Sequence, residues 1–190
     1  MMPAQSGSPT RSAAGPSDAE LVMTARRGKT WAQEVLFRRH ARMAIGLAHR
    51  LLPHDGEVED LVQDCFVQAL KRLHTLQNPQ AFAAWLGSIV VHAVGKRLRR
   101  QKLLSRLGLR TPESIDNLSI ASPTAPGEVV VELRRVYGVL ASLPSEQRIA
   151  LVLRRVDGME IPQIADYMGL SMSTVKRRLK TAEEELERRR

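Results

Sequence analysis

The chain has 190 residues, enough for one or two small domains, and a formal net charge of +9 at neutral pH. So strong a positive charge indicates a polyanionic partner, most often nucleic acid and less often an acidic membrane surface. The single cysteine, Cys65, excludes an internal disulfide and is typical of a reducing cytoplasm, and no apolar run approaches the ~20 residues that span a bilayer. We therefore expect a cytoplasmic protein without membrane insertion.

The N-terminal end of the chain predicts a tail followed by two helices. Residues 1–16 lack the apolar core of a signal peptide and are expected to be disordered. Residues 17–28 begin with an S-x-x-E capping box and end at a glycine, which predicts a short helix. The same signature at Thr30 and Gln33 predicts the start of a longer helix, which should run through Leu52.

The third helix is expected over residues 57–74, where apolar residues recur at helical spacing. Its opposite face begins with a cluster of acids and no cation: Asp55, Glu57, Glu59, Asp60 and Asp64. Acids in a first turn stabilise a helix through its dipole, which explains most of this cluster but not Asp64, which lies further along. The other interpretation is a protein-docking face, because phosphates would repel these acids.

The fourth helix is expected to begin at Asn78, as N-cap, with Pro79 in its first position. Its C-terminal part turns strongly basic, with seven cations and no acid over residues 96–110. We favour a phosphate-binding role for this segment over a merely solvated helix end.

A linker is predicted over residues 111–127, which hold three prolines and no helical periodicity. Helices resume after it, and Val136 and Val156 are expected on inner faces. The sequence thus predicts an all-α protein with two small helical domains joined by a flexible linker. The boundaries that we assign are 1–16 for the tail, 17–106 for the first domain, 107–127 for the linker and 128–190 for the second domain.

Residues 161–180 predict a helix-turn-helix. Gly169 stands where a helix end favours a residue of positive φ, and Ser171 is a suitable N-cap for the helix that follows. In that second helix the residues expected inward are Met172, Val175 and Leu179, and those expected outward are Ser173, Lys176, Arg177 and Lys180. The simpler alternative is a helical hairpin with a solvated basic face. The coincidence of small residues and cations favours a DNA reader.

Residues for catalysis or for a cofactor are not found. The five histidines lack partners at metal-ligand spacing, and neither a glycine-rich phosphate loop nor a nucleophile motif occurs. Cys65 lies on the apolar stripe of the third helix and is expected to be an inert core thiol. We therefore expect a binding protein rather than an enzyme, with no metal and no cofactor.

Three segments in this order resemble bacterial sigma factors of the extracytoplasmic-function class. They are EDLVQDCFVQALKRL (59–73), FAAWLGSIVVHAVGKRLRR (82–100) and LPSEQRIALVLRRVDGMEIPQIADYMGLSMSTVKRRLKTAEEEL (143–186). The resemblance covers roughly residues 18–104 and 128–188. It implies two globular domains, called region 2 and region 4, and a function as the promoter-specificity subunit of RNA polymerase.

The resemblance also implies roles for individual residues. Asp60, Gln63 and Asp64 would dock on the clamp helices of the largest polymerase subunit. The flap of the polymerase is the other implied contact of the protein. The residues that would melt and read the promoter −10 element are Trp85, His92, Lys96, Arg97, Arg99 and Arg100. Those that would read the −35 element as duplex are Ser173, Thr174, Lys176, Arg177 and Lys180, with Arg148, Arg154 and Arg155 as candidate backbone contacts. An anti-sigma factor is a further implied partner, beside core RNA polymerase and promoter DNA.

The sequence departs from the family pattern at a few of these positions. The family commonly has Asn where this chain has His92, Asp where it has Lys96, and a small Ser where it has Arg177. These departures leave the exact promoter sequence open.

The rival interpretation is a stand-alone DNA-binding regulator that dimerises on palindromic operators. It is disfavoured by the acidic helix and by Trp85, which lies beside a cation-rich helix outside the helix-turn-helix domain.

Overall fold

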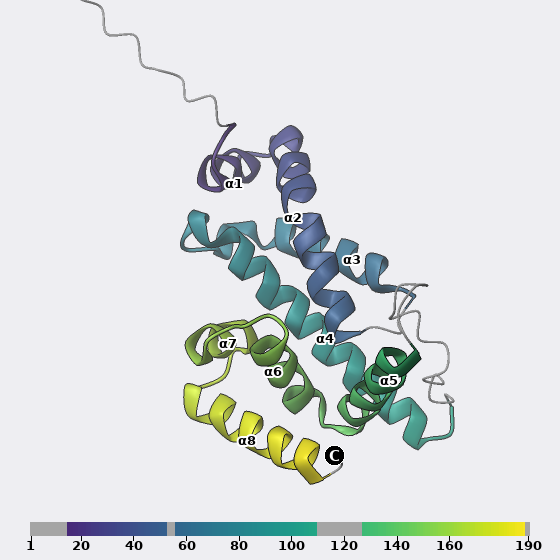
Figure 1. Cartoon of the computed structure of the whole chain (residues 1–190). Helices are drawn as coiled ribbons and strands as arrows, with labels where there is room; N and C mark the ends of the chain where they lie inside the picture. The colour runs from purple at the N-terminus through teal and green to yellow at the C-terminus, as the bar shows by residue number, and fades with distance from the viewer. Residues whose placement is uncertain (1–14, 53–55, 110–126, 189–190) are drawn as a thin grey trace, which may run out of the picture.

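The computed structural model describes residues 15–52, 56–109 and 127–188 (Figure 1). Within these ranges the chain forms only helices, which confirms the predicted all-α class, and no described helix has the length and apolarity to cross a membrane. The helices are α1 (Asp18–Arg26), α2 (Thr30–Leu51), α3 (Val58–Lys71), η1 (Leu73–Thr75), η2 (Pro79–Ala81), α4 (Phe82–Arg106), α5 (Gly127–Ser142), α6 (Ser145–Arg155), α7 (Ile161–Met168) and α8 (Met172–Arg188).

The first bundle consists of α1 to α4. Helix α2 packs against α1, α3 and α4, and α3 packs against α4 (Figure 1). Phe82, at the start of α4, is fully buried between these helices, together with Leu36 of α2 and Val62 of α3. The 25-residue α4 is thereby held along its N-terminal half, while its basic C-terminal end extends from the bundle.

Three predicted helix ends in this bundle are wrong. Thr30 is already helical; the N-cap is Lys29, without a side-chain cap hydrogen bond, so the second capping box does not form. Helix α3 ends at Lys71 rather than 74, because residues 73–75 tighten into the 3₁₀ turn η1. The Asn78 side chain accepts a hydrogen bond from the Gln80 backbone N–H, but it caps η2, and α4 begins only after this turn.

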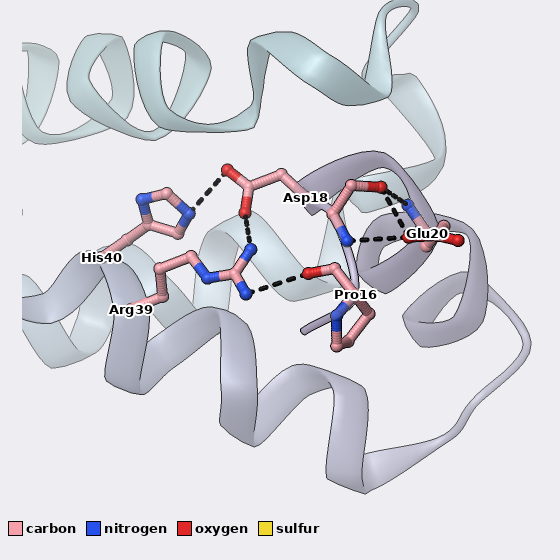
Figure 2. A network of polar contacts seen from close by, with 6 residues as sticks. Pro16, Asp18, Glu20, Arg39 and His40 are labelled. Atoms are coloured by element: carbon pink, nitrogen blue, oxygen red, sulfur yellow. Dashed lines mark hydrogen bonds and ion pairs between the residues drawn. The ribbon is translucent and has the colours of Figure 1, made fainter. Parts of the chain in front are cut away.

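Helix α1 is fixed to α2 through the side chain of Asp18 (Figure 2). One carboxylate oxygen accepts a hydrogen bond from Arg39 Nη1 at 2.6 Å, and the other lies 2.9 Å from His40 Nε2. Arg39 also donates to the carbonyl of Pro16, at 2.9 Å. The predicted capping box of Ser17 and Glu20 is confirmed, so the first helix is held both by its own cap and by α2.

This cap gives a pH-dependent prediction. Hydrogen bonds from the backbone and hydroxyl of Ser17 lower the pKa of Glu20 below 4.5. A carboxylate whose pKa is lowered on folding stabilises the fold above its unfolded pKa, and that contribution is lost as the pH falls through the folded value. Apart from this charge, Ser17→Ala removes the N-cap hydroxyl, and loss of a serine N-cap should lower the free energy of unfolding by about 1 kcal/mol at pH 7. Urea titrations should show Glu20→Gln and the wild type converging below pH 4.5; parallel curves down to pH 3 would contradict the assignment.

The second bundle consists of α6 to α8, and α5 precedes it in the chain. Helix α6 packs on α8 and α7, and α7 packs on α8, around buried Ile149, Leu153 and Ile164. Three residues predicted inward are instead exposed: Val136 (40 %), Val156 (61 %) and Met172 (54 %). Val156 and Met172 lie at the C-cap of α6 and the first position of α8, beyond the packed part of each stripe, and Val136 lies on the outer side of α5.

The two bundles lie against each other, with α7 and α6 packed along α4 and α6 near α2 (Figure 1). Most of the predicted linker, and nearly all of the predicted disordered tail, lie outside the described residues. Helix α4 therefore packs against both α3 and α7.

Candidate functional site

A groove of about 640 Å³ runs between α3 and α4, and one of its walls is acidic and the other basic. The acidic wall carries side chains of α3, and the basic wall carries side chains of the middle and C-terminal half of α4. Seven of the predicted polymerase-binding and −10 residues line it: Asp60, Asp64, Trp85, His92, Lys96, Arg97 and Arg100. The structure thus brings together the predicted docking acids and most of the predicted −10 residues, whereas Gln63 and Arg99 lie exposed outside the groove lining.

The acids at the start of α3 divide into two groups. Glu57 forms an ion pair with Arg97 of α4, and Glu59 lies 3.3 Å from His49 of α2. Asp60 and Asp64 are exposed, and their side chains have no hydrogen bond or ion pair with the described part of the chain. Intramolecular stabilisation therefore accounts for Glu57 and Glu59 but leaves the other two carboxylates available to a partner.

Gln63 shares this free face. It is exposed, and it makes no side-chain hydrogen bond with the residues that the structure describes. In an α-helix residues separated by three or four positions lie on one face, so Asp60, Gln63 and Asp64 form a single patch, followed one turn later by exposed Val67. An acidic patch with an apolar end suits a protein surface that carries cations.

The basic wall of the groove is built on one face of α4. Trp85 is half-buried and packs on Phe82, with ring centroids 6.2 Å apart, so its indole is fixed beside the groove. His92 donates from Nδ1 to the carbonyl of Ser88 at 2.6 Å, which fixes its ring. Exposed Lys96 follows one turn later. A rigid aromatic ring beside cations is the arrangement by which single-stranded nucleic acids are held through stacking and phosphate contacts.

Cys65 faces the inside of this region and is not a reactive group. Its side chain is buried, and burial raises the pKa of the thiol to about 11, with the Asp64 charge adding to the shift. At neutral pH the thiolate, which is the nucleophilic form, is therefore nearly absent. The expected burial of this thiol in the core is confirmed.

The helix-turn-helix has the geometry expected from its sequence. Gly169 ends α7 in the left-handed region at φ 62°, and the hydroxyl of Ser171 accepts a hydrogen bond from the backbone N–H of Thr174 at 3.2 Å. Because the Thr174 hydroxyl also bonds Ser171, at 2.9 Å, this residue takes part in the cap and is only half exposed. The exposed residues on this side of α8 are Ser173, Lys176, Arg177 and Lys180.

The three arginines considered as backbone contacts all have partners within the chain. Arg154 donates to the carbonyl of Met159 and pairs with Glu160, and Arg155 pairs with Glu183 at 2.6 Å. Arg148 is largely buried, and its guanidinium donates to the carbonyl of Leu51 in the first bundle at 2.7 Å. Its burial lowers its pKa to about 10. Sequence periodicity gave no sign of this contact, because it joins residues 97 positions apart.

The fold and the helix-turn-helix together define a two-domain helical DNA-binding protein. Residues 36–103 match the family of Sigma-70 region 2, and residues 133–186 match Sigma-70, region 4. The chain is 33% identical over 172 residues to the ECF RNA polymerase sigma factor SigM of Mycobacterium tuberculosis, covering 90% of this chain and 84% of that protein. It is 29% identical over 184 residues to the ECF RNA polymerase sigma-E factor of Escherichia coli K12, covering 90% of this chain and 93% of the other.

Solved structures agree with this relationship. CnrH, in complex with the cytosolic domain of CnrY, superposes with a TM-score of 0.59 at 28% identity, covering 90% of this chain and 96% of CnrH. The sigma factor RpoE of Bartonella quintana, in complex with the anti-sigma factor NepR, shares the fold with a TM-score of 0.61 at 22% identity, covering 85% of this chain and 96% of RpoE. The chain therefore belongs to the extracytoplasmic-function class of RNA polymerase sigma factors. Its function is promoter-specific initiation of transcription.

Proposed function

We propose that the free face of Asp60, Gln63 and Asp64 docks on the clamp helices of the largest subunit of core RNA polymerase. The observation that carries this assignment is that Asp60 and Asp64 are the acids of α3 whose side chains have no partner among the described residues, on a chain of net charge +9. Electrostatic complementarity of this kind accelerates encounter and fixes the orientation of the complex. Region 4 would contact the flap of the polymerase in the same assembly.

For promoter DNA, we assign the −10 element to α4 and the −35 element to α8. Trp85, His92 and Lys96 would hold extruded nontemplate bases, and Arg97, Arg99 and Arg100 would grip the backbone of the open strand. On α8 the exposed Lys176, Arg177 and Lys180 would enter the major groove, with Ser173 and Thr174 at the helix N-terminus. The capping bond of Thr174 makes it the least available of these.

The remaining assignments follow from the class of protein. We propose that the protein acts in the cytoplasm, where transcription takes place, and that it performs no chemistry of its own and needs no cofactor. The domain boundaries that we propose are 17–106 for region 2 and 128–190 for region 4, with a linker over 107–127 and a tail over 1–16. An anti-sigma factor is a further proposed partner, because RpoE of Bartonella quintana, which shares the fold, was solved in complex with the anti-sigma factor NepR.

Reconstitution tests this function directly. Purified protein is added to core RNA polymerase, the complex is isolated by gel filtration, and transcription is measured from promoters found by mapping the transcripts that rise on overproduction. We expect a stable complex and transcripts that depend on the added protein. A chain that bound palindromic duplex DNA as a dimer but formed no complex with core polymerase would instead be a stand-alone regulator.

A further inference from the structure

The turn between α3 and α4 is held by an arginine of α1. Arg26, the last residue of that helix, donates from Nε to the carbonyl of Leu73 at 3.2 Å and from Nη2 to the carbonyl of Leu76. These carbonyls lie 47 and 50 positions further along the chain, at the first residue of η1 and at its C-cap. One guanidinium therefore joins the first helix of the bundle to both ends of η1.

The partners of Arg26 indicate what this side chain does. A cation in the last turn of a helix commonly stabilises the terminal carbonyls and the dipole of its own helix, which is the simpler explanation for an arginine at this position. The donors of Arg26 instead reach another segment, and no acid among the described residues pairs with it. Two hydrogen bonds from one planar guanidinium fix the backbone of a turn more rigidly than a single point donor would.

The turn has little internal structure of its own. Its helical part, η1, is a 3₁₀ helix of three residues, and its N-cap, Arg72, makes no side-chain cap hydrogen bond. Hydrogen bonds in 3₁₀ helices have poorer geometry than those in α-helices. The side chains of Leu73 and Leu76 are buried and hold the inner side of the turn, whereas Gln77 and Asn78 are exposed. Burial thus sets where the turn lies, and Arg26 fixes how its carbonyls are oriented.

The position of this turn determines how α4 begins. The second 3₁₀ segment, η2, leads directly into Phe82, the first residue of α4, and α1 packs on η2 as well as on η1. Phe82 is fully buried, and Trp85 packs on it one turn later, with ring centroids 6.2 Å apart. A displacement of the turn would therefore be passed on to the indole that lines the groove between α3 and α4.

We propose that Arg26 is a positioning residue for opening of the −10 element. By clamping the turn between α3 and α4, it holds the N-terminal end of α4, and with it Trp85, in the geometry that receives an extruded base. Arg26 acts through the turn and not through contact with DNA. A preorganised site avoids the cost of ordering its parts at each binding event, so loss of the clamp should slow opening without removing a DNA contact. The clamp stands on the contacts above, whereas its effect on opening rests on the proposed function of α4.

The clamp is measured first on the free, full-length chain by amide hydrogen exchange. Arg26→Gln keeps a polar side chain but removes the charge and the fork. We expect exchange over residues 72–81 to become about tenfold faster, the factor that one charge-assisted hydrogen bond supplies. The reporting amides are those of Thr75 and Leu76, which are hydrogen-bonded within the turn. Arg26→Lys can reach one carbonyl at a time and should restore part of the protection.

Two other variants of this segment are matched controls. Arg27→Gln removes the same charge from the adjacent residue, which is exposed and whose side chain has no hydrogen bond or ion pair with the described residues. Ser17→Ala weakens the same helix at its other end by removing the N-cap hydroxyl. Neither residue contacts the turn, so each variant should change exchange over residues 72–81 by less than about twofold. If either control accelerated this exchange as much as Arg26→Gln, the clamp would be overturned.

Promoter opening is measured with core RNA polymerase and a promoter identified by transcript mapping. The fluorescence of 2-aminopurine in the nontemplate strand reports the opening rate at saturating promoter and core, and anisotropy reports the affinity for core. We expect Arg26→Gln to lower the opening rate about tenfold and to leave the affinity for core within about twofold of the wild type. Arg26→Lys should give an intermediate rate. A simple loss of folded protein would lower the active fraction in both measurements, whereas a positioning role changes the opening rate alone.

The combined results separate the clamp from its function. Normal opening by Arg26→Gln, with exchange accelerated, would overturn the positioning role but not the clamp. Slow opening with unchanged exchange would mean that Arg26 acts on the DNA directly, which would overturn the proposal. If neither exchange nor opening changed, both parts would be wrong. A wild-type protein that bound core but opened no promoter would instead contradict the function assigned to α4, with the exchange result standing.

Discussion

Reversal of the two free acids of α3, in the variant Asp60→Lys, Asp64→Lys, should reduce the affinity for core RNA polymerase by at least about 100-fold, or about 2.7 kcal/mol. Both side chains are exposed and lack partners in the described part of the chain, so the change should leave the fold intact. In the complex the two new lysines would face the polymerase surface that binds these acids in the wild type. Like charges brought together at such an interface cost several kcal/mol. Fluorescence anisotropy of the labelled protein titrated with core polymerase measures this loss.

A matched control separates a specific docking face from a general charge effect. Glu34→Lys, Glu187→Lys makes the same change in net charge at exposed acids on α2 and α8, and it should weaken binding less than threefold. Binding of duplex −35 DNA through α8 should be unchanged in the Asp60, Asp64 variant. Equal losses in both double variants would show that net charge alone, rather than this face, drives the association.

The two helical domains could be predicted because each amphipathic stripe is a local pattern. The spacing of apolar residues gave α3 and α4, and the combination of Gly169 and Ser171 gave the turn of the helix-turn-helix. Apart from Val136, in the middle of α5, the errors lie at or next to helix ends, where caps of similar free energy compete. Thr30 illustrates this, because a suitable N-cap residue became the first helical residue instead.

The candidate site could be predicted residue by residue but not as an assembly. The cluster of acids was visible in the sequence, but the division between paired Glu57 and Glu59 and free Asp60 and Asp64 depends on where Arg97 and His49 lie. In the same way, the family resemblance makes Arg148 a candidate contact to the DNA backbone, whereas in the structure its guanidinium donates to the carbonyl of Leu51 in α2. Contacts between residues far apart in the chain carry no periodic signal, and these contacts decide which charges remain available.

The largest expected effect on stability is that of Phe82→Ala, which should lower the free energy of unfolding by about 3–5 kcal/mol. Phe82 is 0% exposed, and its ring packs near those of His40 and Trp85, with centroids 5.2 and 6.2 Å away. Truncation removes the buried surface and leaves a cavity at the start of α4, which cannot collapse because helices from three sides meet there. Urea unfolding followed by tryptophan fluorescence measures the change.

Phe37→Ala provides the matched comparison for this effect. Its ring also packs on an aromatic partner, Phe66, with centroids 4.8 Å apart, but the side chain is 41% exposed, so the same truncation should cost about 1 kcal/mol. A small domain has only about 5–15 kcal/mol of stability in total. Loss of Phe82 should therefore free the N-terminal end of α4 and misplace Trp85. We expect promoter strand opening to be impaired by this change before binding of core polymerase through α3 is lost. Equal losses at Phe37 and Phe82 would mean that α4 is not anchored at this end.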